Sequence, residues 1–477
     1  MTQTSDIAVN YTPDQVPAQR YRSVSDLRLE EQGIKYVRVQ YVDYGNVVRF
    51  RVLPVAYFKR ICKNARPGLN VSPLALAFVG VQFAGGFTRT GECLQAIDLN
   101  SFRVCTYAPG HAVVMTWFQE KSPAPGVGLA VPLCARTTLQ RVVDEAREKA
   151  GLTFLVGFES EFFLLKKTSP PEVVNDAGWG AAGGYLTGAP ESAVLDEIID
   201  CLELVGIEVH FIHGEAAPGQ YELVTGPTSP LDAADALVFS RETIYNIAHK
   251  HGLRATFAPK VHFPIGSGNH MHLSLYSSKP VVKPDAREDA VLAPELTPVE
   301  RSFLQTLVEH LPALSAITLP TPASYKRVED GIFSGGTYAC WGWRNKDAPV
   351  RLCGEGNPNQ FEVKTIDGTS NPYLVTSGIL VAGLEGVLNG AELRTGNCAK
   401  PVAQMNDEER KAVGLENPRR YPRTPSDARR LLNEDQYLND ALGAEFVHIF
   451  VNVNKLLEQS MASFSEEESL KHLVKTF

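Results

Sequence analysis

Two glutamates inside an otherwise apolar segment constrain this chain more than any other feature. The segment FLVGFESEFFLL, residues 154–165, is predicted to form a strand. Residues two apart in a strand project from the same face, so Glu159 and Glu161 would lie side by side. Like charges in apolar surroundings are costly unless a cation or a proton resolves them. The simpler alternative is an edge strand with one face exposed to solvent.

Three later segments supply more side chains of this kind. They are Glu215 and Glu222 in HGEAAPGQYE (residues 213–222), His270 and His272 in GSGNHMHLSL (266–275), and Glu362 with Lys364 in QFEVK (360–364). Each has an ordinary alternative when it is taken alone. The first would be a polar loop, the second a strand with satisfied histidines, and the third a simple Glu–Lys pair.

Taken together, these segments indicate a divalent-metal site. They provide five carboxylates and two imidazoles, all from predicted strands or the turns beside them. Carboxylate-rich sites suit Mg²⁺ or Mn²⁺ rather than zinc, and no cysteine stands beside these acids in the sequence. Two such ions could clamp a nucleoside triphosphate and the oxygen that accepts its phosphoryl group.

Composition excludes several other classes of protein. The 477 residues are 44% hydrophobic, which is enough for a large core and more than one domain. The net charge is -8 and no long Lys/Arg run occurs, so nucleic acid is not an expected partner. No apolar run approaches the roughly 20 residues of a membrane span, and no membrane partner is expected. The polar N-terminus and scattered cysteines lead us to expect no signal peptide and a cytoplasmic location.

The apolar pattern predicts an α+β chain with a flexible tail at residues 1–20 and two domains. The first, residues 21–122, contains a short helix at 23–32 capped by Ser25, a β-hairpin at 36–54, and strands near 94–98, 104–107 and 112–118. A Pro/Gly-containing linker follows at 123–126. The second domain, residues 127–477, is expected to bind ATP. Its predicted helices are 138–150, 191–205, 229–250, 297–312, 374–390, 425–432 and 438–459, and its predicted strands are 153–166, 207–211, 221–224, 270–276, 349–353 and 359–364. Residues 167–190 and 395–425 are expected to be long loops.

The order of these motifs resembles the glutamine synthetase superfamily. The motifs are ESE, HGEAAPGQYE, GSGNHMH, SYKR, WRNKDAPVR, EVK and SNPYL, and the resemblance runs from about residue 20 to the C-terminus. Residues 41–54 and 98–115 resemble the family's N-terminal β-grasp domain. The amino-acid sequences of these two stretches are similar to those of the branch that includes fungal FluG-like proteins and glutamyl-polyamine ligases. The implied fold is a small β-grasp domain followed by a large glutamine synthetase-type catalytic α/β domain.

The resemblance also implies a role for each matching residue. The metal ligands that it implies are Glu161, Glu215 and Glu222 for one divalent ion, and Glu159, His270 and Glu362 for a second ion that touches the ATP phosphates. Its nucleotide and phosphate contacts are His272, Ser274, Arg351 and Lys346, where Lys346 replaces a second phosphate-binding arginine and Arg351 meets the transferred phosphate. Its substrate-binding residues are Gly266, Arg327, Lys364 and Phe333, with Arg327 on the α-carboxylate. The implied cofactors are ATP, as a substrate, and Mg²⁺ or Mn²⁺, about two or three per site.

Two departures from the family pattern concern the amine. Ammonia-using members carry an aspartate that is donated to the neighbouring subunit's site, and the corresponding stretch here is GLNVSP at residues 68–73. They also carry a glutamate six residues after the substrate arginine, and Phe333 stands there, although Glu329 and Asp330 are close. Removing ammonium from water is expensive without fixed carboxylates. An apolar residue instead suits a larger organic amine.

Two further departures concern the acid. Ile265 replaces an asparagine before the Gly-Ser-Gly turn, and Lys364 replaces an arginine, which keeps the charge but loses the planar fork. Because Arg327 is retained, glutamate is the best single candidate, against another amino or carboxylic acid.

The sequence therefore predicts an ATP-dependent ligase that joins the γ-carboxylate of glutamate, activated as an acyl phosphate, to an organic amine. The alternatives are a true ammonia-using glutamine synthetase and a catalytically silent structural member. All six metal-ligand positions are retained, which favours catalysis. The expected partners are a small-molecule acid and an amine. The resemblance also implies a ring-shaped homo-oligomer with sites shared between subunits.

Overall fold

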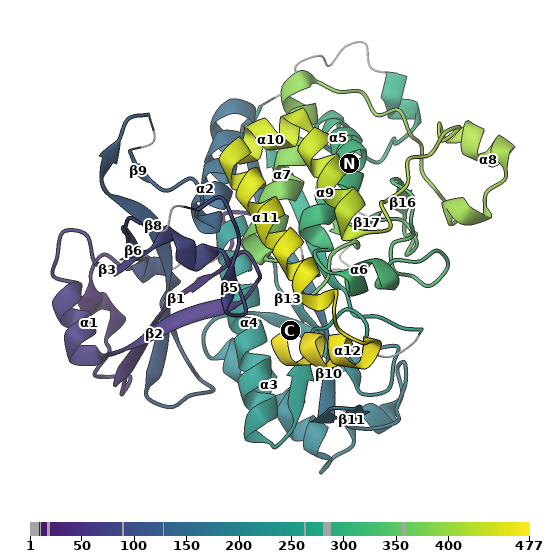
Figure 1. The fold of residues 1–477 in the computed structure, drawn as a ribbon. Helices are drawn as coiled ribbons and strands as arrows, with labels where there is room; N and C mark the ends of the chain where they lie inside the picture. The colour runs from purple at the N-terminus through teal and green to yellow at the C-terminus, as the bar shows by residue number, and fades with distance from the viewer. Residues whose placement is uncertain are drawn as a thin grey trace.

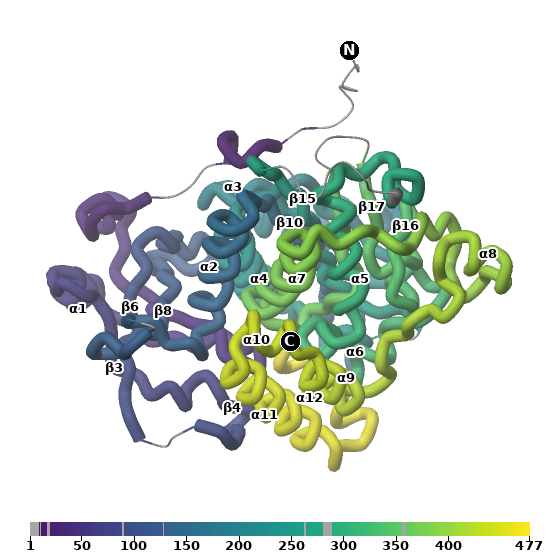
Figure 2. The backbone as a smooth tube through the Cα atoms, turned by 90° about the horizontal axis from the view of Figure 1, so that it is seen from above, coloured from purple at the N-terminus to yellow at the C-terminus, as the bar shows by residue number. Residues whose placement is uncertain are grey.

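A computed structural model gives the fold of residues 9, 11–16, 20–87, 90–126, 128–261, 264–279, 288–354 and 359–477. Two large sheets organise these residues, one of seven strands and one of nine, and a small third sheet pairs β4 (Phe78–Val79) with β5 (Gln82–Phe83). Figures 1 and 2 show the smaller N-terminal sheet on one side of the larger part of the chain, with α8 (Asp407–Ala412) projecting at the opposite end. In these ranges, no helix has both the length and the apolar character that a membrane crossing requires.

The first sheet begins with the predicted hairpin. Strands β1 (Tyr36–Val42) and β2 (Val48–Pro54) pair antiparallel. The strand order is β2-β1-β8-β6-β3, and β1 runs parallel to β8. The remaining strands are β3 (Gly68–Val71), β6 (Cys93–Ile97), β7 (Arg103–Val104), β8 (His111–Ala124) and β9 (Gly128–Ala130). The core on one face is completed by α1 (Val55–Ile61), whose Phe58 is fully buried.

Four expectations for this region need correction or restriction. The predicted helix at 23–32 is only a 3₁₀ turn, Val24–Leu27, capped by Ser23 rather than Ser25, because the backbone turns left-handed at Arg28 (φ 46°). The predicted linker at 123–126 belongs to a hairpin in which Ala124 pairs with Gly128 of β9. The domain division between residues 122 and 127 remains a prediction. Most of the predicted tail, at 1–8, 10 and 17–19, lies outside the described residues.

The second sheet is built around one long strand, β10 (Leu152–Thr168), which contains the ESE motif. The strand order is β12-β13-β10-β15-β18-β17-β16, and β11 and β14 also pair with β10. These strands are β11 (Pro171–Val173), β12 (Val209–Gly214), β13 (Gln220–Thr225), β14 (Arg254–Thr256), β15 (Asn269–Ser277), β16 (Trp341–Trp343), β17 (Val350–Cys353) and β18 (Gln360–Val363). The four motif-bearing segments are therefore neighbours in one sheet.

Helices complete the larger part of the molecule. They are α2 (Ala135–Glu145), α3 (Pro190–Glu203), α4 (Pro230–Lys250), α5 (Pro298–Thr318), α6 (Pro322–Arg327), α7 (Pro372–Asn389), α9 (Pro425–Glu434), α10 (Gln436–Leu442), α11 (Ala444–Met461) and α12 (Glu466–Thr476). The α7 helix is almost entirely apolar and buried, and it packs against α5. Asn371 caps it through hydrogen bonds from two backbone N–H groups.

Two predicted helices differ clearly in extent from those of the structure. The α5 helix does not stop at Pro312 but continues to Thr318, where Leu314 and Ile317 are buried. Burial of that last turn outweighs the hydrogen bond that the proline removes. The helix predicted at 438–459 is two helices, α10 and α11, because Gly443 adopts φ 105° between them. The predicted loops at 167–190 and 395–425 also contain β11 and α8.

Candidate functional site

Strand register brings the predicted ligands together. Glu161 on β10 lies opposite Glu222 on β13, and Glu159 lies opposite His270 on β15. One pair further along β15, His272 lies opposite Glu362 on β18. Opposed residues in antiparallel strands have Cβ atoms about 5 Å apart, so their side chains meet on one face.

His270 lies between the two predicted ligand sets. Its Nδ1 atom is 3.1 Å from a Glu159 oxygen and 3.3 Å from a Glu362 oxygen, and its Nε2 atom is 3.6 Å from Glu161. The Glu161 carboxylate also accepts hydrogen bonds from the Gly268 N–H and the Gln220 side chain. A side chain at Gly268 would put a Cβ atom 2.5 Å from His270 Nε2, so only glycine fits there.

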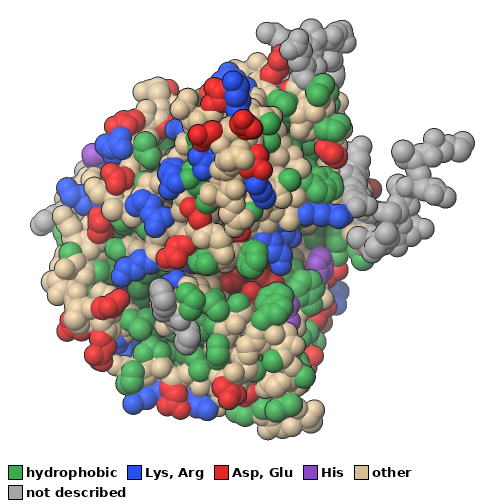
Figure 3. Space-filling view, turned by 90° about the vertical axis from the view of Figure 1, so that its right-hand side faces the viewer, with side chains coloured by type: hydrophobic (Ala, Val, Ile, Leu, Met, Phe, Trp, Pro, Cys, Tyr) green, Lys and Arg blue, Asp and Glu red, His purple; other side chains and the backbone are tan. Residues whose placement is uncertain are grey.

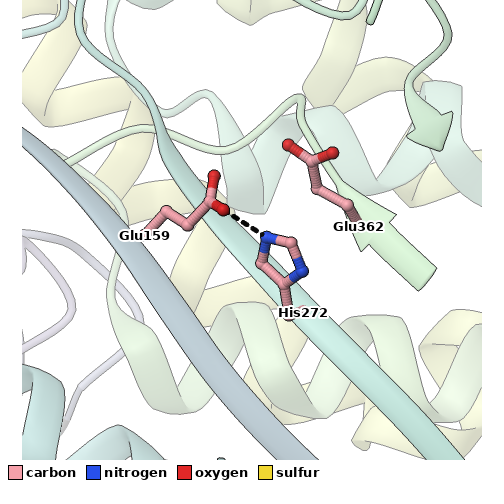
Figure 4. A group of neighbouring side chains, drawn as sticks. All are labelled: Glu159, His272 and Glu362. Carbon is pink, nitrogen blue, oxygen red and sulfur yellow. Dashed lines mark ion pairs between the residues drawn. The ribbon is translucent and has the colours of Figure 1, made fainter. Parts of the chain in front are cut away.

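His272 joins the carboxylates, although the resemblance placed it on the nucleotide. Its Nε2 atom is 2.9 Å from Glu159, and Figure 4 shows Glu362 across from this pair. Burial raises the pKa of Glu159, but the charge of His272 and a hydrogen bond with His270 outweigh burial and hold it well below its usual value. Ser274 follows on the same strand, opposite Leu155, and does not line the cavity described below.

The second acidic group contains a histidine that the sequence reasoning passed over. His213 Nε2 lies 3.2 Å from Glu222, and His213 Nδ1 lies 3.8 Å from Glu215. The hydrogen bond with Glu222 raises the pKa of His213 to about 9. Burial, followed by the charges of Glu161 and Glu222, raises the pKa of Glu215 to about 8. His213 opens the HGEAAPGQYE motif, so its position next to Glu215 was the available signal.

Two cations face Glu362. Arg351 Nε lies 2.8 Å from one carboxylate oxygen, and Lys364 Nζ lies 3.0 Å from the other. Burial alone would raise the pKa of Glu362, but Lys364, His270 and His272 lower it to about 2. Cys353 Sγ is 3.7 Å from Glu362, so the expectation that no cysteine stands beside the acids holds along the sequence but not in space.

Arg327 is held in place by backbone carbonyls. The side chain is 3% exposed, and its Nη2 donates to the carbonyls of Lys364 and Ile366, each at 3.0 Å. Its Nε has no hydrogen-bond partner among the described residues. A Cβ at Gly266 would approach Arg327 Cγ to 2.5 Å, so this glycine lets the stem of the arginine side chain lie against the turn. A fixed guanidinium with a free donor is suited to a carboxylate.

A cavity of about 740 Å³ joins these groups to an apolar wall. The acids, His213, His270, Arg327, Lys346, Arg351 and Lys364 line it, and its large apolar lining residues are Trp179, Phe211, Ile265, Ile332 and Phe333. The sequence reasoning missed Trp179 and Phe211. Trp179 stands in an irregular Gly-rich segment without periodicity, and its ring is 5.6 Å from Lys346 Nζ. On the face drawn in Figure 3, acidic side chains are recessed behind hydrophobic ones.

Phe333, rather than a nearby acid, lies in the apolar wall of this cavity. It is 65% exposed and adopts φ 62°, a conformation that is uncommon for a bulky residue. The Asp330 carboxylate accepts hydrogen bonds from Thr337 N and Oγ1, at 2.7 and 2.9 Å, and neither Glu329 nor Asp330 lines the cavity. The alternative in which one of these acids replaces the missing glutamate is therefore not supported.

The donor set fits hard divalent cations. Two triads have ligand atoms within 4.8 Å of one another, namely Glu159 with His272 and Glu362, and Glu159 with Glu222 and His270. Buried carboxylates this close repel one another. In the second triad, burial raises the pKa of Glu222, and the charges of Glu159 and Glu161 raise it further. A divalent cation would remove this repulsion, and oxygen-rich sets are those that Mg²⁺ and Mn²⁺ prefer.

Comparison with known proteins identifies the family of this chain. Residues 132–469 match the family described as "Glutamine synthetase, catalytic domain". Protein fluG of Emericella nidulans is 30% identical over 459 residues, which cover 93% of this chain but 49% of that protein, so the chain spans about half of that relative's length. Gamma-glutamylpolyamine synthetase GlnA3 of Streptomyces coelicolor is 29% identical over 429 residues, covering 87% of this chain and 88% of that protein. The crystal structure of a novel glutamine synthase homolog superposes with a TM-score of 0.76 at 23% identity, covering 93% of this chain and 99% of that one.

Proposed function

Because this chain belongs to the glutamine synthetase family of ATP- and divalent metal-dependent ligases, we propose that it joins the γ-carboxylate of glutamate to an organic amine. The observation that carries the proposal is a single cavity with a cluster of acids at one end and an apolar wall at the other. The name of the GlnA3 relative, a gamma-glutamylpolyamine synthetase, supports the same class of product.

The acidic end is suited to activating a carboxylate. We assign Glu161, Glu215 and Glu222 to one divalent ion and Glu159, His270 and Glu362 to another; the short contact between His272 and Glu159 adds His272 to the second group. Divalent ions held by these residues would neutralise phosphate charge during phosphoryl transfer. Arg351 and Lys346 line the same cavity and would stabilise charge on the transferred oxygens.

The chain's own residues also orient the acid. The Nε of Arg327 has no hydrogen-bond partner among the described residues, which indicates that it binds a carboxylate ligand. We assign this ligand as the α-carboxylate of glutamate. The Gly266 backbone and Lys364 line the cavity beside it. Holding the acid at one end leaves its γ-carboxylate directed toward the acidic cluster, where activation gives an acyl phosphate that an amine can attack.

The apolar end is suited to the amine. Phe333, Trp179 and Ile332 offer surface to an alkyl or aryl group and no carboxylate for a hydrated ammonium ion. Apolar contact of this kind also excludes water, which would otherwise hydrolyse the acyl phosphate. An organic amine is therefore favoured over ammonia.

The decisive experiment is ATP-dependent phosphate release across a panel of amines, with glutamate and Mg²⁺ held constant. We expect organic amines to saturate the enzyme at lower concentrations than ammonium. Saturation at low ammonium would instead establish an ammonia-using enzyme. If Mg²⁺ and ATP neither stabilise the chain against heat nor support turnover, the protein is a silent member.

Glu161→Ala provides the matching test of the site. The Glu161 carboxylate accepts hydrogen bonds from Gly268 N and the Gln220 side chain, and it contacts His270. Removing this carboxylate should abolish turnover and leave the sheet folded. Glu172→Ala on β11, an exposed acid of the same sheet, is the control and should retain activity. Retained turnover in Glu161→Ala would refute the metal assignment.

A further inference from the structure

A second cavity, of about 650 Å³, shares no lining residue with the candidate site. It lies between the turn that joins β1 to β2, the middle of α4, the start of β14 and the C-terminal end of α12. Its lining is mixed, with Val47, Val238 and Val474 as apolar members.

The unusual member of this cavity is Arg241 on α4. The residue is 6% exposed, and its Nε and Nη2 atoms have no hydrogen-bond acceptor among the described residues. Its Nη1 reaches only the Ser370 carbonyl, at 3.4 Å, and the guanidinium lies 5.6 Å from the Phe257 ring centre. No carboxylate in the described ranges lies within ion-pair distance of it. Burial lowers the pKa of Arg241 to about 10, which reflects the cost of an unpaired buried cation.

We propose that this cavity binds a small anion that carries a carboxylate or a phosphate group, held by Arg241. Nε and Nη2 form one edge of the planar guanidinium, and two parallel N–H groups on that edge match two oxygens of either group. Arg254 and Lys475 line the same cavity and are exposed, so with Arg241 they outnumber the negative charges of Glu242 and the Phe477 carboxylate, which also line it. The two nitrogens have almost no accessible surface in this arrangement. Binding therefore requires the guanidinium to turn toward the cavity when the anion enters.

Backbone contacts connect this cavity to the acid-binding arginine. Arg241 contacts the Ser370 carbonyl, and Asn46 Nδ2 donates to the Gly368 carbonyl at 2.9 Å. The same segment, residues 364–370, supplies the two carbonyls that hold Arg327. An anion that turns Arg241 removes its bond to this segment, so occupancy should change the KM for the acid. The site is therefore an effector site, and it does not depend on which amine the enzyme uses.

Calorimetric titration with inorganic phosphate and, separately, with succinate tests the proposal. Binding of one and not the other identifies the group that the cavity takes. Arg241→Met removes the fork, and Arg241→Lys keeps the charge without the planar geometry. We expect each variant to weaken binding by at least about tenfold, the value of one charge-assisted hydrogen-bond pair. The lysine variant preserves a folded protein if the methionine variant does not.

Phosphate can also bind the catalytic end, so Arg351→Met is the matched control. Arg351 faces Glu362 in the first cavity, and its loss should leave the Arg241-dependent binding unchanged. The bound anion should also shift the KM for the acid in the wild type and not in Arg241→Lys. If the wild type binds neither anion, or if both Arg241 variants bind as the wild type does, the proposal is wrong.

Discussion

At the scale of single residues, Trp179 offers the clearest test of amine recognition. Its ring is 62% exposed, lines the catalytic cavity, and lies 5.8 Å from the His213 ring and 5.6 Å from Lys346 Nζ. Removing one large apolar contact costs about 1–3 kcal/mol, so Trp179→Ala should raise the KM for the amine by at least about fivefold. Leu186→Ala, an exposed apolar residue outside the cavity lining, is the control. An unchanged amine KM in steady-state assays would remove Trp179 from the site.

Glu215 gives a second prediction at this scale. Burial and the charges of Glu161 and Glu222 disfavour its carboxylate when no cation is present. Glu215→Gln removes one of the repelling charges, so it should stabilise the metal-free protein by about 1 kcal/mol, or roughly 2 °C in Tm. It should also reduce the stabilisation that Mg²⁺ adds. Scanning calorimetry with and without Mg²⁺ measures both effects, and a lower metal-free Tm would contradict the assignment.

The site residues show what the sequence could and could not predict. The period of a strand was enough to place Glu159 beside Glu161, and motif order paired them with His270 and Glu362. Trp179 and Phe211 were not predicted as site residues, because the sequence around an apolar residue in a loop or on an edge strand does not indicate that the residue lines a cavity. Likewise, Cys353 is nine residues from Glu362 in sequence, and only the pairing of β17 with β18 brings them together.

At the scale of secondary-structure elements, the His310 side chain links three helices. It stands on α5, with Nε2 2.6 Å from Glu385 on α7 and Nδ1 2.6 Å from Asp435, which caps α10. Its ring also stacks on Tyr437, with 5.8 Å between ring centres. Burial opposes the charged form, but the hydrogen bonds to Asp435 and Glu385 outweigh it and raise the pKa of His310.

This raised pKa predicts how stability depends on pH. The folded protein holds the His310 proton more tightly than the unfolded chain, so its contribution is complete below an unfolded pKa of about 6.5. The contribution is lost as pH rises through the higher folded value. His310→Phe should therefore lower the free energy of unfolding by about 2 kcal/mol at pH 6 and by less at pH 9. Urea denaturation at both pH values measures the difference, and an equal loss would contradict the linkage.

Element boundaries show where local sequence signals fail. Most predicted helices and strands of the larger part are found, because long apolar patterns survive tertiary packing. The prediction of a helix at 23–32 was wrong because Arg28 adopts a left-handed conformation, which ends the helix after one turn. No residue type in this segment indicates that conformation. The end predicted at Pro312 failed for the opposite reason, since burial of Leu314 and Ile317 kept the helix intact beyond the proline.

At the scale of the whole molecule, the catalytic cavity is open on the side of its apolar wall. All its lining residues lie between Glu159 and Lys364, so the N-terminal sheet of the same chain contributes none. Trp179 and Phe333 remain 62% and 65% exposed in the single chain. A neighbouring subunit that covers them would complete the site, in keeping with the shared sites that the family resemblance implies. Sedimentation should therefore show an assembly several times heavier than 52.2 kDa.

Mixing two inactive variants would decide whether the sites are shared. Glu161→Ala disables the catalytic cavity, whereas Asn70→Trp would place a bulky ring on β3, in the stretch expected to reach a neighbour's site. Asn70 is exposed, so the substitution should leave the fold intact. In a randomly reassembled ring, a site works only when its cavity and its neighbour's N-terminal sheet are both intact, which restores roughly a quarter of wild-type activity. If each chain instead carries a complete site, Asn70→Trp alone stays active and the mixture gives half of that activity.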